Sequence, residues 1–113
     1  MLATNQQQGY GYYVASESES TGRLVIYDSS VCFMSKDGDT VYWVLAYDDI
    51  DKLEKRDRII SKSISSKLRT ESGKDILIVS DTGEEKTLRN VDERDEVFSQ
   101  IVGFSSTIWQ VVW

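Results

Sequence analysis

The chain has 113 residues and a mass of 12.9 kDa, which is the size of one ordinary domain, and its 40% of hydrophobic residues allow a packed core. It has no histidine and one cysteine, which excludes a Ser-His-Asp or Cys-His triad, a Cys/His zinc site and an internal disulfide. Its formal net charge of −6, if spread evenly, argues against nucleic acid and anionic membranes as partners.

The N-terminus has neither the basic region nor the apolar run of a signal peptide, and the sequence has no apolar run long enough to span a bilayer. We expect residues 1–9 to form a flexible N-terminal segment. After them, short stretches with apolar residues at alternate positions, separated by turn residues, predict β-strands. These strands are expected at residues 10–15, 22–27, 31–35, 41–46, 50–55, 76–80 and 85–88.

The last element is expected to be a helix at about residues 92–110. Asn90 and Asp92 precede Glu93, Asp95 and Glu96, and short polar residues followed by acids favour the start of a helix. Four apolar residues then recur at helical spacing and define one apolar face: Val97, Ile101, Phe104 and Ile108.

Together these elements predict a mainly β fold. Seven antiparallel strands limit their exposed edges by bending into a sandwich or partly open barrel, and one C-terminal α-helix can cap its open end. The pleckstrin-homology (PH) superfold is built in this way. We therefore expect a PH-like domain over residues 10–113.

Charge is segregated along the chain. Residues 1–51 carry a net charge of −6, residues 52–74 carry +5, and residues 75–113 carry −5. Such a basic segment can contact anionic lipid headgroups. Its candidate lipid-binding residues are Lys52, Lys55, Arg56, Arg58, Lys62, Lys67, Arg69 and Lys74.

Three apolar residues in this segment, Ile60, Ile64 and Leu68, are candidate membrane contacts. Their spacing of four fits an amphipathic helix at a membrane surface, but all three also occupy even positions, as in a strand. A solvated loop, or an edge strand protected by lysines, explains the same residues. Nucleic acid is not expected, since the flanking segments are acidic and no aromatic residue lies between the basic ones.

Other polar motifs predict structural roles. The first hairpin contains Glu17 and Glu19 beside Arg23, a poor cradle for phosphate, because the carboxylates oppose an anion. The acidic clusters at 37–39 and 48–51 lack the ligand spacing of a calcium loop and fit turn chemistry. Arg94 and Asp95 are expected to connect the helix start to neighbouring strands.

Three further side chains are assigned to packing. Cys32 is expected to be an inert buried residue within an apolar strand. Trp43 and Trp109 are expected to be core aromatic residues. No metal and no cofactor are expected.

The order of several short motifs resembles a GRAM domain. They are Gly22-Arg23-Leu24, Cys32-Phe33-Met34-Ser35, Asp49-Ile50 followed by basic residues, Ile76-Leu77-Ile78-Val79, and Arg94-Asp95-Glu96-Val97-Phe98. GRAM domains are PH-like modules of membrane-associated proteins, including TBC-type Rab GTPase-activating proteins, sterol-transfer proteins and myotubularins. The resemblance implies a module for membrane targeting in membrane trafficking, often with phosphoinositide or phosphatidylserine binding.

We therefore expect a non-catalytic adaptor that binds anionic phospholipid through residues 52–74, within a larger peripheral membrane protein on the cytoplasmic side. The alternative is a protein–protein or intramolecular docking module that binds no lipid.

Overall fold

The computed structural model describes residues 12–64, 67–105 and 107–113, and at Tyr12 and between residues 58 and 72 it describes the backbone alone. The segment predicted to be flexible, residues 1–9, lies outside the described residues.

The first four strands form one antiparallel sheet, sheet A, in the order β1-β2-β3-β4. They are β1 (Tyr12–Glu17), β2 (Ser20–Ile26), β3 (Ser30–Ser35) and β4 (Val41–Ala46). The turn between β3 and β4 places Gly38 at φ +81°, a conformation that glycine adopts without strain. Asp37 stabilises this turn by accepting hydrogen bonds from the Ser35 hydroxyl and the Asp39 amide. The turn chemistry predicted for residues 37–39 is thereby confirmed.

The second sheet, sheet B, has the order β7-β6-β5-β8. Its strands are β5 (Ile50–Ile64), β6 (Lys67–Ser80), β7 (Glu85–Leu88) and β8 (Gln110–Val112). A short 3-10 turn, η1 (Tyr47–Asp49), leads from sheet A into β5. Strand β8 lies parallel to β5, and the other pairs of sheet B are antiparallel.

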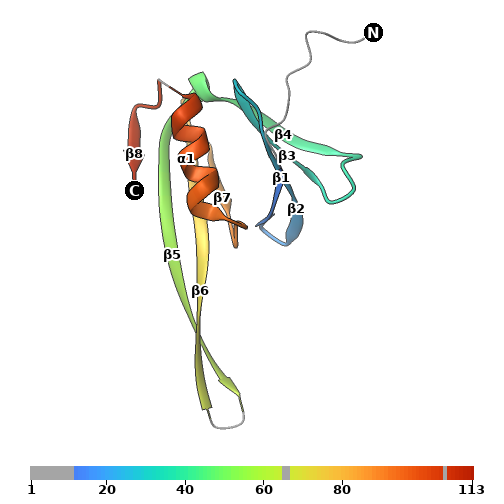
Figure 1. Ribbon diagram of the computed structural model, residues 1–113, viewed down its shortest axis with the longest axis vertical. Helices are drawn as coiled ribbons and strands as arrows, with labels where there is room; N and C mark the ends of the chain where they lie inside the picture. The colour runs from blue at the N-terminus through green and yellow to red at the C-terminus, as the bar shows by residue number, and fades with distance from the viewer. Residues whose placement is uncertain (1–11, 65–66, 106) are drawn as a thin grey trace.

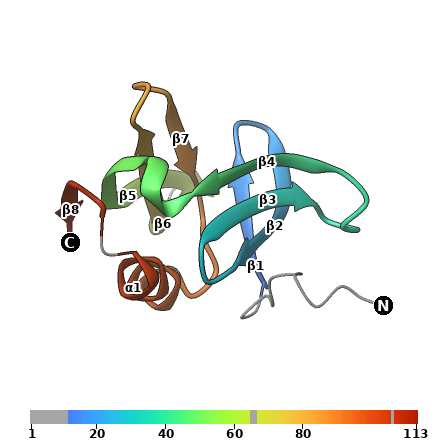
Figure 2. The same cartoon turned by 90° about the horizontal axis from the view of Figure 1, so that it is seen from above.

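Backbone hydrogen bonds and one helix hold the two sheets together. The amide of Ser16 donates to the carbonyl of Arg89 at 2.9 Å, and the amide of Arg89 donates back at 2.7 Å, so β1 is tied to the end of β7. The helix α1 (Arg94–Phe104) lies over both sheets (Figures 1 and 2). Its buried residues Val97, Phe98 and Ile101 complete a core formed by the inner faces of the two sheets.

The mainly β architecture with one C-terminal helix is confirmed. The prediction of seven strands, all antiparallel, is wrong for the described residues. They contain eight strands, four in each sheet. The additional strand is β8, whose residues pair with 52–54 of β5 because the chain turns back after the helix. This pair protects the edge of β5 at the body of the domain.

The helix is shorter than the predicted 92–110. It begins at Arg94 after Glu93, which has a left-handed backbone (φ 49°) and gives no side-chain cap, so neither Asn90 nor Asp92 is the residue at which the helix starts. It ends at Phe104, since Ser105 is extended. Beyond it, Ile108 still packs on the core, whereas Trp109 is 88% exposed and is not the core residue that we expected.

The hairpin of β5 and β6 is the largest departure from expectation. The predicted strands at 50–55 and 76–80 are only its inner halves, and the two strands continue together to Ile64 and Lys67. The outer part extends beyond α1 and sheet A (Figure 1), and the domain measures 59 × 32 × 23 Å. Here we call residues 58–64 and 67–72 the ribbon. Seven residues of extended strand span about 20 Å.

Two glycines give a test of this packing. A Cβ on Gly22 would lie 2.4 Å from the Met34 carbonyl oxygen and 2.9 Å from the Phe33 ring, so Gly22→Ala should destabilise the domain by about 1–3 kcal/mol. A Cβ on Gly103 in α1 would meet nothing within 4 Å, so Gly103→Ala should stabilise it by about 0.5–1 kcal/mol. Denaturant unfolding measures both effects, and equal effects of the two substitutions would contradict this packing.

Candidate functional site

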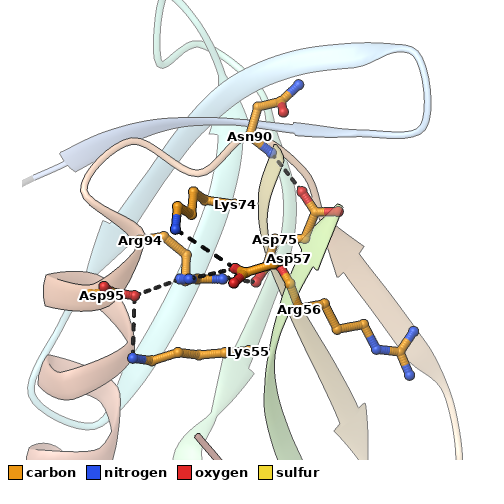
Figure 3. A network of polar contacts seen from close by, with 8 residues as sticks. All are labelled: Lys55, Arg56, Asp57, Lys74, Asp75, Asn90, Arg94 and Asp95. Carbon is orange, nitrogen blue, oxygen red and sulfur yellow. Dashed lines mark hydrogen bonds and ion pairs between the residues drawn. The ribbon is translucent and has the colours of Figure 1, made fainter. Parts of the chain in front are cut away.

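Arg94 lies at the point where α1 meets the root of the β5–β6 hairpin (Figure 3). The residue is 5% exposed, and its side chain donates hydrogen bonds to the backbone carbonyls of Arg56 on β5, at 3.0 Å, and Asp75 on β6, at 3.1 Å. The predicted role of Arg94 in connecting the helix start to the strands is confirmed. One buried guanidinium thus holds three elements in place.

Two carboxylates balance the charge of Arg94. Asp57 accepts a hydrogen bond from it at 2.8 Å and Asp95 accepts one at 2.7 Å. Asp95 also pairs with Lys55 at 3.2 Å, while Lys74 lies 3.9 Å from Asp57. The hydrogen bond from Arg94 is the main reason why the pKa of each carboxyl group lies below its usual range.

Sequence reasoning missed Asp57 and Asp75 as members of this network. The Asp75 carboxylate is buried and accepts a hydrogen bond from the backbone amide of Asn90 at 3.0 Å, which fixes the segment leading into α1. The pairing of Asp57 with Arg94 spans 37 residues, so no local pattern reveals it. The sequence signal that could have identified Asp57 is an acidic residue within a basic segment.

The four candidate lipid-binding residues at the root of the hairpin are engaged within the domain. Lys52 pairs with Glu54 at 3.1 Å, and Arg56 pairs with the same carboxylate. These two contacts lower the pKa of Glu54, with Arg56 as the first cause. Lys55 lies 5.3 Å from the ring centres of both Phe98 and Trp113 in addition to its pair with Asp95.

The other four candidates lie on the ribbon. Its backbone register pairs Lys62 with Arg69, Ile64 with Lys67 and Arg58 with Gly73. Because directly paired residues share a face and faces alternate along each strand, all four basic positions fall on one face of the ribbon, which also has the position of Glu71, the partner of Ile60. We call it the basic face. The opposite face has the positions of Ser61, Ser63, Thr70 and Ser72.

The ribbon also decides how the three candidate membrane contacts are arranged. A strand, not a helix, is the conformation of the described part of this segment. Ile60 and Ile64 therefore occupy positions on the basic face, whereas Leu68 pairs with Ser63 and belongs to the opposite face.

The first hairpin carries an acidic hollow. An open depression of about 490 Å³ lies between the β1–β2 turn and β7, and its lining residues are Glu17, Ser18, Glu19, Glu85, Thr87 and Arg89. Glu17 accepts a hydrogen bond from the Trp43 indole at 2.9 Å. Three carboxylates against one arginine oppose a phosphate there, as the sequence predicts.

In the described part of the chain, no group of three or more Asp, Glu or Cys residues is arranged to hold a metal ion. The helix among the described residues is too short and too polar to cross a membrane.

Comparison of the chain with protein-family models, with curated proteins and with solved structures finds no match in any of the three.

Arg94 gives the first prediction for this site. Arg94→Met removes the donor shared by two strand carbonyls and should destabilise the domain by about 2–3 kcal/mol. The matched control is Arg56→Met, because Arg56 is exposed and points away from the network (Figure 3), and its loss should cost less than about 0.5 kcal/mol. Equal losses in denaturant unfolding would show that Arg94 does not hold the hairpin root.

The lowered pKa values of Asp57 and Asp95 predict an acid-sensitive stability. A carboxyl group whose folded pKa lies below its unfolded value, about 3.9, stabilises the fold fully above that pH and loses this contribution as the pH falls through the folded pKa. In Asp57→Asn/Asp95→Asn, the thermal midpoint should be lower at neutral pH and should fall less between about pH 5 and 2. The control Asp51→Asn/Asp81→Asn removes two exposed carboxylates outside the network. An identical change of slope in both variants would contradict the assignment.

Proposed function

We propose that this domain is a non-catalytic membrane-targeting adaptor that binds anionic phospholipid through the basic face of the ribbon, as part of a larger membrane-associated protein on the cytoplasmic side. A PH-like arrangement of the GRAM type is part of this proposal. Two sheets tied at one edge, with a C-terminal helix over them, and the motif order noted in the sequence support it.

The observation that carries the proposal is the cross-strand pairing of Lys62 with Arg69. Like charges directly opposite one another destabilise a two-stranded ladder. In the described residues no third strand pairs with the ribbon, since β7 pairs with 76–79 of β6 and β8 pairs with 52–54 of β5. A two-stranded ladder is only marginally stable in water, so a pair of like charges that weakens it further is unusual in a ribbon with a purely structural role. An anionic surface would relieve it.

Charge favours the same surface. Residues 58–72 carry a net charge of +3, whereas the rest of the chain carries −9. The acidic body is repelled by an anionic membrane and the ribbon is attracted, so the domain should bind with the ribbon towards the bilayer. Each lysine or arginine near such a surface contributes about 1 kcal/mol to binding.

Two apolar positions extend the contact. Ile60 and Ile64 lie on the basic face, where they can enter the headgroup region between the cationic positions. We retain these two residues with Arg58, Lys62, Lys67 and Arg69 as the membrane-binding set. The basic residues at the root of the hairpin pair with carboxylates of the domain instead.

Vesicle co-sedimentation tests the proposal with two variants of equal net charge. Lys62→Gln/Arg69→Gln and Ser61→Glu/Thr70→Glu each lower the charge of the ribbon by two, but on opposite faces of adjacent cross-strand pairs. Loss of two cationic contacts, about 2 kcal/mol, should weaken binding to phosphatidylserine vesicles about thirtyfold in the first variant. The second variant should lose clearly less.

Three outcomes would contradict the proposal. The wild-type domain could ignore vesicles of phosphatidylserine or of a phosphoinositide at low salt, both variants could lose binding equally, or binding could resist added salt, which screens charges at a surface. In the first case the docking module without lipid binding becomes the better assignment. Phosphatidylcholine vesicles serve as the neutral control.

A further inference from the structure

Strand β4 is an open edge of sheet A. It pairs with β3 on one side, and in the described residues no strand pairs with its other side. Its six residues, Val41–Ala46, contain no charged residue, proline or glycine. Three large side chains are exposed along it: Val41 by 54%, Tyr42 by 47% and Val44 by 60%.

The other edges of the described body are protected. β1 is bridged to Arg89, and β5 is covered at 52–54 by β8. β7 has four residues and begins with Glu85 and Lys86, and short length and charge are both devices that prevent strand addition. β4 has neither short length nor charge, although its register with β3 shifts between Phe33 and Met34, which leaves Tyr42 without a direct partner on β3. An exposed edge is where an extended peptide can add as a further strand.

The edge is also held rigidly. On the inner side of β4, the Trp43 indole donates to Glu17 at 2.9 Å and Lys86 lies 4.9 Å from the Trp43 ring centre. The Phe33 ring packs at 5.5 Å from Tyr42 and 5.8 Å from Trp43, measured between ring centres. A strand fixed in this way loses little conformational entropy when another strand pairs with it.

Charge at the two ends of β4 indicates the occupant. Asp37 and Asp39 lie exposed in the turn before the strand, where Lys36 and Arg23 also lie and Arg23 is close to Asp37, and Asp48 and Asp49 lie exposed in η1 after it. A basic residue at each end of an added strand would face Asp39 at one end and Asp48 and Asp49 at the other. Antiparallel pairing of two β4 edges would instead bring Asp39 of one copy towards Asp48 of the other, and like charges there oppose a dimer.

We propose that the β4 edge is a docking site for an extended peptide segment of a partner protein, added as a fifth strand of sheet A, with β-branched residues at its centre and a basic residue at each end. This surface lies on the other sheet from the ribbon. The inference does not depend on lipid binding.

A pair of synthetic peptides tests the site: acetyl-Lys-Val-Thr-Val-Thr-Val-Lys-amide and the same peptide with glutamate at both ends. Binding to the full chain is followed by fluorescence anisotropy and by NMR amide shifts. The basic peptide should bind at least about tenfold more tightly than the acidic one at low salt. Its amide shifts should centre on residues 41–46, and methylating its backbone amides should abolish binding.

Variants of the chain complete the test. Val44→Lys places a charge on the edge and should weaken binding about tenfold or more. Val14→Lys is the matched control, because Val14 is also half exposed but lies on β1. Asp39→Lys/Asp49→Lys should reverse the preference between the two peptides.

The proposal is wrong if the N-methylated peptide binds as well as its parent, if Val14→Lys weakens binding as much as Val44→Lys, or if the shifts map to the ribbon. Self-association of the wild-type chain that Val44→Lys abolishes would identify a second copy as the occupant and would overturn the assignment of a partner peptide. Because the β4 edge and the ribbon are separate surfaces, Val44→Lys should bind vesicles as tightly as the wild-type chain does.

Discussion

The buried guanidinium of Arg94 is the constraint on which the rest of the structure depends. Two strand carbonyls and two carboxylates satisfy it, and these four groups come from β5, β6 and α1. An arginine that is 5% exposed is tolerable only with such compensation, because a buried charge without partners is very costly. The helix start and the hairpin root must therefore form together. The left-handed backbone at Glu93 and the hydrogen bond from Asn90 to Asp75 follow from bringing the chain to this point.

The same network divides the basic segment into two parts with different roles. At the root, Lys55 and Lys74 are placed beside Asp95 and Asp57, the carboxylates that Arg94 holds. The ribbon extends beyond the acidic body of the domain. Because side chains alternate along a strand, its basic positions lie on one face. A net charge of −6 conceals this arrangement, since the ribbon carries +3 and the rest of the chain −9. Charges that are segregated along the sequence are therefore also segregated in space, because the hairpin projects from the rest of the domain.

Local patterns predicted the short strands that lie between turn residues. Residues 41–46 and 85–88 form strands at the expected bounds, and the turns containing Gly38 and Gly83 have the positive φ that their sequences suggest. The ribbon was harder, because spacings of four among its apolar residues fit a helix as well as a strand. Pairing between the two neighbouring strands of the hairpin decided for the strand. The helix was predicted too long because Ile108 continues its apolar period, although that residue reaches the core from beyond the helix end.

Protection of strand edges links the two surfaces that we propose as functional. The ribbon has open edges, but lysines and arginines along it disfavour the addition of another strand and favour an anionic surface. β4 has the reverse character, since its edge is apolar and its ends are acidic. A basic strand suited to β4 is repelled by the ribbon, and an acidic membrane suited to the ribbon is repelled by the ends of β4. In the two proposals, opposite charge assigns each partner to its own surface, and because these surfaces belong to different sheets, binding of a membrane would not exclude binding of a protein segment.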